Sequence, residues 1–401
     1  KPVMVVKAGR SAEGARAAAS HTGALAGNDA VYDTAFRRAG MLRVATLSEL
    51  FDAAETLAMG FKPSGDRLAI LTNGGGIGVL ATDAAISECA QLAELSQATL
   101  ACLDAVLPPT WSHSNPVDII GDATETRYKD ALTVLAKDPA VDAILVLNCQ
   151  TAVASSTDAA QAVIDSANGN PNVPFLTSWV GDDGVKEARR LFSKHLIPGY
   201  DTPEQAVRAF MYTVNYRRNQ ETLIETPPSI PEIFSTNPQQ ARTIVQKVLA
   251  ENRSWLTEPE TKDVLSSYGI PVAVTRLAVT PDEAASLAAE TGGPVVLKIV
   301  SPDIVHKTDI GGVALDLASP ADVCEAAKLM QAKIAKVKPE ARLSGFSVQP
   351  MIIRPSAYEL IIGVTEDPQF GPTILFGQGG TAVEIIADQA LALPPLNMRL
   401  A

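Results

Sequence analysis

The sequence predicts an α/β protein in which doubly wound parallel sheets precede a C-terminal part with an antiparallel or mixed sheet. Two observations carry this prediction. Short apolar strands alternate with helical periodicity through the first half of the chain, and strands follow one another closely near its end. Alternation favours a parallel sheet because each crossover needs a helix. Closely spaced strands favour antiparallel or mixed pairing.

The first predicted domain covers residues 1–62. Apolar runs and helical spacing predict strands at residues 3–7 and 41–44 and helices at residues 30–39 and 47–58. Between the first strand and the first helix, the stretch from Arg10 to Gly27 is rich in small residues and glycine. We expect it to form a mobile loop.

The second predicted domain covers residues 66–220. Strands are expected at residues 67–72, 141–148 and 173–179, with helices that include residues 79–88 and 203–218. The repeated strand and helix signals predict a doubly wound parallel sheet. Four prolines lie between residues 225 and 240, so residues 221–240 are interpreted as a linker between domains.

The third predicted domain covers residues 241–401. Helices are expected at residues 258–268 and 281–291, and strands at residues 272–277, 295–299, 345–350, 359–364 and 373–376. Because three of these strands cluster after residue 344, the sheet of this domain is expected to be antiparallel or mixed.

Composition and charge narrow the classes of function. The net charge of -12 disfavours binding to nucleic acid or to an anionic membrane. No apolar run reaches the roughly 18 residues that a membrane-spanning helix needs. The four cysteines are scattered with no CxxC spacing, which disfavours a disulfide framework or a zinc site and favours the cytoplasm.

His21 lies in the segment Ser20-His21-Thr22-Gly23, among small residues. An imidazole is a good nucleophile near neutral pH, and it can accept a phosphoryl group and pass it on. A flexible segment would let it move between two sites. A loop histidine with only a structural hydrogen bond remains the alternative.

Gly74, Gly75 and Gly76 follow the strand at residues 67–72 and open a helix. Glycines let the backbone approach an anion closely, and the unpaired N–H groups and dipole of a helix start favour negative charge. Phosphate is therefore a natural ligand. The pattern matches neither the usual dinucleotide signature nor a P-loop, and a glycine turn needed only for packing remains possible.

Several residues of the third domain suit a nucleotide. Lys298 ends an apolar strand and needs a partner, which a phosphate would provide. His306 lies in a polar loop closed by glycines. Gln349 and Met351 flank a strand edge of the kind that holds an adenine, and Glu359 follows on a strand. Each of these features alone is also compatible with a structural role.

A further glycine loop contains Gly379 and Gly380. Asp367 and Glu384 bracket it in the sequence. Two carboxylates beside a phosphate-sized glycine loop suit Mg²⁺, which prefers oxygen ligands and nucleotide phosphates. These two side chains are therefore the candidate metal ligands.

Three motifs now carry a resemblance to a known family. The segment Ser20-His21-Thr22-Gly23-Ala24-Leu25-Ala26-Gly27 resembles the phosphohistidine segment of ADP-forming acetyl-CoA synthetases and of the wider succinyl-CoA synthetase superfamily. The segment from residue 258 onward is similar to the ATP-grasp module of these enzymes. It shares His306-Lys307-Thr308-Asp309-Ile310-Gly311-Gly312-Val313 and Gly377-Gln378-Gly379-Gly380. The resemblance covers essentially the whole chain.

The resemblance implies a fold of flavodoxin-like domains followed by an ATP-grasp domain, and it implies roles for individual residues. On this resemblance, His21 would be the primary phosphoryl acceptor and His306 the second one. The helix opening at Gly75 and Gly76 would stabilise the phosphorylated imidazole. Lys298 would contact nucleotide phosphates, and Gln349 and Met351 would flank the adenine. Glu359 would touch the ribose, and Glu384 with Asp367 would hold Mg²⁺.

The implied activity is the interconversion of acyl-CoA, ADP and phosphate with a carboxylic acid, CoA and ATP. The family begins with a CoA-binding domain and its ATP-grasp module extends further, so the chain is expected to be an internal portion of a longer polypeptide. A homodimer or higher oligomer is expected. The alternative is a regulatory region of a lysine acetyltransferase that senses acyl-CoA or nucleotide, because Tyr216-Arg217-Arg218-Asn219-Gln220 resembles fusions with an acetyltransferase domain.

Overall fold

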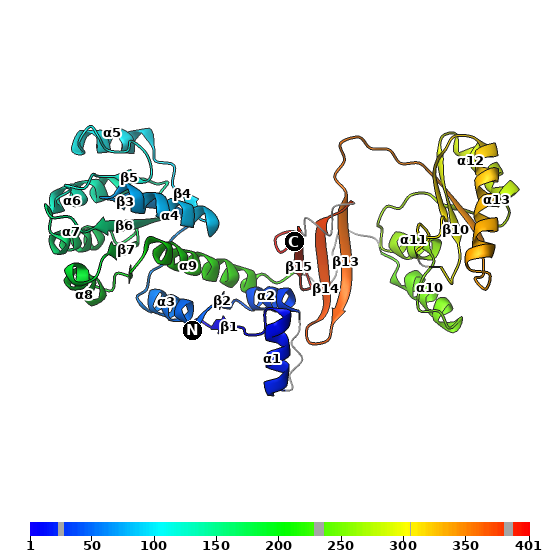
Figure 1. Ribbon diagram of the computed structural model, residues 1–401, viewed down its shortest axis with the longest axis horizontal. Coiled ribbons are helices and arrows are strands. Elements are labelled where there is room, and N and C mark those ends of the chain that lie inside the picture. The colour runs from blue at the N-terminus through cyan, green and yellow to red at the C-terminus, as the bar shows by residue number, and fades with distance from the viewer. Residues whose placement is uncertain (23–27, 228–235, 305, 381–387) are drawn as a thin grey trace. The chain divides into compact units, whose positions relative to one another are not determined.

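The computed structural model describes residues 1–22, 28–227, 236–304, 306–380 and 388–401. The chain forms two compact units (Figure 1). The first unit contains Lys1–Pro227 together with Leu360–Ala401, and the second contains Pro228–Glu359. This division differs from the predicted boundaries, which placed all of residues 241–401 in one domain.

The N-terminal part of the first unit is built on a two-stranded parallel sheet. Its strands are β1 (Met4–Val6) and β2 (Leu42–Val44), and its helices are α1 (Ala12–Thr22), α2 (Asp29–Arg38) and α3 (Leu47–Ala58). Thr46 caps α3 by accepting a hydrogen bond from the Glu49 amide, which explains why the helix begins where the sequence predicts.

A six-stranded sheet forms the centre of the first unit. Its strands are β3 (Arg67–Thr72), β4 (Gln91–Leu92), β5 (Val117–Asp118), β6 (Ala143–Cys149), β7 (Phe175–Val180) and β8 (Gly199–Tyr200). The strand order is β4-β3-β6-β7-β8, with β5 paired to β3, and every pair is parallel. This is the flavodoxin-like order, and it confirms the predicted doubly wound parallel sheet.

Helices cover both faces of this sheet. They are α4 (Gly75–Ser87), α5 (Gln97–Val106), α6 (Glu125–Leu135), α7 (Ser156–Gly169), α8 (Lys186–Lys194), which follows the short 3₁₀ turn Asp183–Val185, and α9 (Pro203–Ile224). Alternate residues of β3 point to opposite faces: Ala69 and Leu71 join the core beneath α5 to α8, whereas Leu68 and Ile70 join the core beneath α4 and α9.

The second unit packs helices on one face of an antiparallel sheet. Its elements are α10 (Pro238–Ala250), α11 (Glu258–Ser267), β9 (Arg276–Ala278), α12 (Pro281–Thr291), β10 (Val295–Val300), β11 (Val313–Leu317), α13 (Pro320–Val337) and β12 (Gly345–Pro350). The strand order is β11-β10-β12-β9, and each pair is antiparallel. Leu297, Ile299 and Phe346 enter the core with α12 and α13.

The last strands form an antiparallel meander: β13 (Leu360–Asp367), β14 (Gly371–Gln378) and β15 (Gln389–Ala392). This meander belongs to the first unit. The ring of Tyr32 on α2 meets the edge of the Phe370 ring, and the Thr34 hydroxyl donates to the Leu391 carbonyl over 3.3 Å. These contacts account for the grouping of Leu360–Ala401 with the N-terminal part of the chain.

Several elements differ from the sequence prediction. Residues 12–22 form α1 rather than a loop, because the alanines of this stretch favour a helix. Helix α4 begins at Gly75, ahead of the periodic stretch at residues 79–88 and within the glycine segment that was expected to open the helix. Strand β9 is short, and residues 272–275, which were predicted to belong to it, lie before it.

Within the described ranges, no helix is long and apolar enough to cross a membrane.

Candidate functional site

The glycine turn after β3 lies where the strand order of the parallel sheet changes direction. Strand β3 is flanked by β4 on one side and β6 on the other, and Gly74 follows its carboxyl end as the N-cap of α4. Open α/β sheets bind ligands at such a switch point. The Thr72 hydroxyl accepts from the Gly74 amide over 3.0 Å and thereby shapes the turn.

The glycines of this turn differ in what surrounds them. A Cβ at Gly74 would lie 3.1 Å from the Cys149 Sγ, and a Cβ at Gly75 would lie 3.0 Å from an oxygen of Asp118. A Cβ at Gly76 would meet nothing within 4 Å. The backbone is therefore closely packed at the first two positions and open at the third, where an anion could approach the first amides of α4.

Two amide side chains, a buried one at Asn73 and a partly buried one at Asn115, fix the turn and the strand before it. The Asn73 side chain pairs with the backbone of Cys149, donating to its carbonyl over 2.9 Å and accepting from its amide over 2.7 Å. The Asn115 side chain accepts from the Ile70 amide and donates to the Leu68 carbonyl, each over 2.9 Å. Sequence analysis did not predict these hydrogen bonds. For Asn73, the available signal was an asparagine placed directly after an apolar strand.

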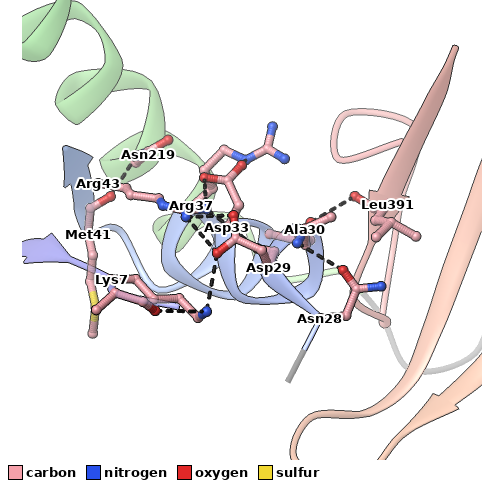
Figure 2. Close-up of polar contacts among 12 residues, drawn as sticks. Lys7, Asn28, Asp29, Ala30, Asp33, Arg37, Met41, Arg43, Asn219 and Leu391 are labelled. Carbon is pink, nitrogen blue, oxygen red and sulfur yellow. Dashed lines mark hydrogen bonds and ion pairs between the residues drawn. The ribbon is translucent and has the colours of Figure 1, made fainter. Parts of the chain in front are cut away.

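His21 lies in the last turn of α1, and α2 begins shortly after it. Figure 2 shows a group of charged side chains that fastens α2 to the neighbouring strands. Arg43 on β2 contacts Asp29 over 2.7 Å and Asp33 over 3.3 Å, and Lys7 contacts Asp29 over 3.2 Å. This group anchors the helix that follows the histidine segment.

The electrostatics of this group favour its ionised form. Burial opposes the charge on Asp29, but hydrogen bonds from Arg43 and Lys7 outweigh that effect and hold the pKa of Asp29 below its usual value. The Lys7 ammonium also lies 4.6 Å from the centre of the Tyr32 ring. Sequence analysis did not predict this group, because its members come from α2, from β2 and from Lys7, which directly follows β1.

In the second unit, Lys298 and Gln349 share one face of the sheet. Val296 lies opposite Gln349 in the antiparallel register, and Lys298 is two residues further along the same strand. The opposite face carries the apolar core residues. Ser347 lies directly across from Lys298, and its buried hydroxyl has no hydrogen-bond partner among the described residues.

Glu258, in the first turn of α11, completes the polar cluster. Its Oε1 lies 2.8 Å from the Lys298 Nζ and 3.1 Å from the Lys262 Nζ. Burial opposes ionisation of Glu258, but the hydrogen bonds from the two lysines prevail and lower its pKa. Sequence analysis missed Glu258 and Lys262, since their partner Lys298 is distant in the chain.

A cleft of about 410 Å³ opens beside this cluster. Its lining includes Glu258, Lys298, His306, Lys307 and Thr308. The structure thus brings together two residues that the sequence singled out, Lys298 and His306, and His306 is exposed to solvent. A cleft with ammonium groups and an accessible imidazole can bind a phosphate group and offer it a nucleophile.

The remaining predicted nucleotide residues are distributed over both units. Met351 is half-buried directly after β12, and its amide donates to the Pro294 carbonyl over 2.8 Å. Glu359 is exposed and lies just before β13 rather than on a strand. Gly379 and Gly380 follow β14 in the first unit, and Gly380 has a φ of 90°, which favours glycine.

The two predicted metal ligands have different positions. Asp367 ends β13 at the β13–β14 turn, where its Oδ1 accepts from the amides of Gln369 and Phe370. Strand β14 therefore separates Asp367 from Gly379 by roughly 23 Å, at about 3.3 Å per residue. Glu384 lies outside the described residues. Among the residues that are described, no group of three or more His, Cys, Asp or Glu side chains could hold a metal ion.

Models of three protein families match successive parts of the chain. Residues 1–57 match the succinyl-CoA ligase like flavodoxin domain, residues 68–224 the ligase-CoA domain, and residues 247–401 the ATP-grasp domain. The third match spans residues of both compact units, because the contacts of the meander place it with the first unit.

Two similar proteins match nearly the whole chain. The chain is 38% identical over 401 residues to the ADP-forming acetate–CoA ligase I of Archaeoglobus fulgidus, covering 100% of this chain and 56% of that protein. It is 35% identical over 398 residues to the ADP-forming 4-hydroxybutyrate–CoA ligase of Nitrosopumilus maritimus, covering 99% of this chain and 56% of that protein. The chain therefore spans a little over half the length of these relatives.

One solved structure is similar to a large part of the fold. It is the dinucleotide-forming acetyl-coenzyme A synthetase 1 of Candidatus Korarchaeum cryptofilum in complex with phosphate and ADP, with 36% sequence identity and a TM-score of 0.53. The similarity covers 57% of this chain and 50% of that one.

Proposed function

Because this chain belongs to the family of ADP-forming acetyl-CoA synthetases, we propose that the protein interconverts acyl-CoA, ADP and phosphate with a carboxylic acid, CoA and ATP. One observation carries the proposal: the chain matches ADP-forming acid–CoA ligases along its full length. The cleft that contains Lys298 and His306 supports it further.

In the proposed reaction, one phosphoryl group is bound in turn to a nitrogen of His21 and to a nitrogen of His306. Phosphate attacks the thioester carbonyl, forming an acyl phosphate, and CoA leaves as the thiol with the proton from phosphate. A nitrogen of His21 then attacks phosphorus, and the carboxylate leaves as the bond between phosphorus and the acyl oxygen breaks. The phosphoryl group finally passes through His306 to a terminal oxygen of ADP.

The residues of the chain take the following proposed roles. The start of α4, at Gly74, Gly75 and Gly76, stabilises the charge on the phosphorylated imidazole. Lys298 binds nucleotide phosphate in the cleft. Gln349 and Met351 contact the adenine. We also propose that Glu359, Gly379 and Gly380 contact the nucleotide.

Magnesium would neutralise phosphate charge during transfer. Asp367 does not fit this role well, because its Oδ1 is used by two backbone amides of the turn. We retain Glu384 as the proposed ligand on the resemblance alone. We further propose an oligomer of a longer polypeptide in the cytoplasm. The free cysteines at all four described positions support a reducing compartment.

Intact-mass measurement of the full-length protein after incubation with Mg-ATP tests the proposal. We expect a gain of one acid-labile phosphoryl group, because phosphohistidine hydrolyses in acid. His21→Ala should abolish the phosphohistidine at position 21, which is the stable product that the relay forms from ATP. His306→Ala should block its formation from ATP. His195→Ala is the matched control, because His195 is an exposed histidine at the end of α8 and has no proposed role.

Retention of the full mass gain in His21→Ala, with peptide mapping that finds no phosphoryl group on His306, would show that His21 is not the acceptor. A wild-type protein that gains no phosphoryl group, although it binds nucleotide, would contradict the enzyme proposal. That result would favour the alternative of a nucleotide-sensing region in a lysine acetyltransferase.

A further inference from the structure

The Glu258 carboxylate forms an ion pair with Lys298, the lysine that is proposed to bind nucleotide phosphate. Its Oε1 lies 2.8 Å from the Lys298 Nζ and 3.1 Å from the Lys262 Nζ. The exposed fractions of these three side chains are 19% for Glu258, 23% for Lys298 and 17% for Lys262. The contact is therefore mostly shielded from water, and it is stronger than an ion pair on an open surface.

The same contact extends across the face of the sheet. Lys262 also donates to the Thr275 hydroxyl over 2.6 Å and to the side-chain oxygen of Gln349. Glu258 and Lys262 thus connect Lys298 to Gln349, the two ends of the proposed nucleotide site. A ligand that replaces Glu258 as the partner of Lys298 must therefore rearrange the contacts from Lys298 through Glu258 and Lys262 to Gln349.

The charges of the cluster do not cancel. Two ammonium groups face one carboxylate, which leaves about one positive charge in a half-buried place. Carboxylate and phosphate oxygens accept hydrogen bonds from the same ammonium donors. Because Glu258 and Lys298 both line the cleft, a phosphate group that enters it meets the carboxylate beside the lysine.

We propose that Glu258 is an internal competitor for the nucleotide phosphate: a nucleoside diphosphate gains the ammonium of Lys298 only by displacing the Glu258 carboxylate. The inference rests on the proposed function, since it assumes that nucleotide binds in this cleft. Glu258 then limits the affinity of the site for ADP. It also makes the site more selective against neutral nucleosides, which cannot replace a carboxylate as a charged partner of the lysine.

Calorimetric titration of the full-length protein with ADP and with adenosine tests this role. In Glu258→Gln the carboxylate charge is absent, so the Kd for ADP should fall about tenfold, the change expected from about 1.4 kcal/mol. The Kd for adenosine should stay unchanged, because adenosine carries no phosphate. Asp263→Asn is the matched control: it removes the same charge from an exposed position on α11 and should leave both constants unchanged.

Two further variants test whether the tighter ADP binding depends on the contact between Glu258 and Lys298. Glu258→Asp, which shortens the side chain and weakens its reach to Lys298, should tighten ADP binding by a smaller factor. In a Lys298→Met background, Glu258→Gln should produce no gain, because the contested ammonium is absent.

An unchanged or higher Kd for ADP in both Glu258 variants, with wild-type melting temperatures, would overturn the inference and leave the proposed function intact. A gain that persists in the Lys298→Met background would also overturn it. If the wild-type protein binds no ADP, the proposed nucleotide site fails and the inference fails with it.

Discussion

Asp142 directly precedes the central strand β6 and joins it to the turn before β3. Its carboxylate accepts from the Arg67 amide over 3.0 Å, from the Arg67 guanidinium over 2.8 Å and 2.9 Å, and from the Ser64 hydroxyl over 3.0 Å. The hydrogen bonds from Arg67 outweigh burial and lower the pKa of Asp142. The ionised carboxylate therefore stabilises the folded state.

This contact predicts a stability difference that depends on pH. Because the folded pKa of Asp142 is below the unfolded value of about 3.9, its contribution is present above pH 3.9 and is lost as pH falls through the folded pKa. Asp142→Asn should lower the melting temperature of the first unit by roughly 5 °C at pH 7. The difference between variant and wild type should shrink below pH 4.

Differential scanning fluorimetry at both pH values measures this difference. Asp130→Asn serves as the control, since Asp130 lies on α6 and takes no part in this contact. An equal destabilisation of Asp142→Asn at pH 7 and at pH 3 would contradict the electrostatic explanation.

At the scale of elements, α4 combines a glycine-rich start with a closely packed turn. The Gly74 N-cap provides no side-chain cap, so the first amides of the helix depend on the turn for their surroundings. A Cβ fits freely at Gly76 but would approach Asp118 at Gly75. The two adjacent positions should therefore respond differently to the same substitution.

Gly76→Ala should stabilise the first unit by about 0.5 kcal/mol, because alanine loses less backbone entropy than glycine in a helix. Gly75→Ala should give no such gain, since its Cβ would lie 3.0 Å from the Asp118 oxygen. Urea unfolding, followed by far-ultraviolet circular dichroism, compares the two variants. Equal free energies of unfolding for both would show that Asp118 moves away without cost.

At the scale of the whole molecule, residues that are distant in the chain form one unit. The meander β13–β15 groups with Lys1–Pro227, although residues 228–359 lie between them in the sequence. Helix α2 provides contacts for this association through Tyr32 and Thr34. The helix that follows the histidine segment is therefore also a support for the last strands.

Phe370→Ala should weaken the attachment of the meander to α2, because it removes the aromatic contact with Tyr32, whose ring centre lies 5.0 Å away. Such pairs contribute about 1 kcal/mol beyond their buried area. Amide hydrogens of β14 should then exchange about fivefold faster, as expected for that energy. Those of α12 and α13 in the second unit should keep their wild-type rates.

Hydrogen exchange with mass spectrometry resolves these segments. Tyr358→Ala is the matched aromatic control, because the Tyr358 side chain is 90% exposed. Unchanged exchange in β14 of Phe370→Ala would show that other contacts hold the meander.

The sequence by itself determined the elements whose boundaries depend on local signals. Helices α3 and α12 and strand β12 have the predicted bounds. Caps explain the starts of the helices, since Thr46 and Thr280 each accept from an amide three residues later. The parallel order of the central sheet followed from alternating strands and helices.

The sequence also identified Lys298 and His306 as candidate residues, and the structure places both in one cleft. It could not identify Glu258, because the contact with Lys298 joins residues 40 positions apart. The pairing of Asn73 with Cys149, across 76 positions, was equally invisible. Hydrogen bonds of this kind depend on how the strands and helices are arranged in space. The periodicity and composition of the sequence do not predict that arrangement.

Only the tertiary structure decided where the C-terminal strands and Asp367 belong. In the sequence, Asp367 is near the glycine loop at Gly379, but an extended strand rises about 3.3 Å per residue and carries the two apart. The meander instead packs with α2, from the other end of the chain. Local patterns determine elements because their causes lie within a few residues, whereas sites and units depend on burial and contacts between segments that only the folded chain brings together.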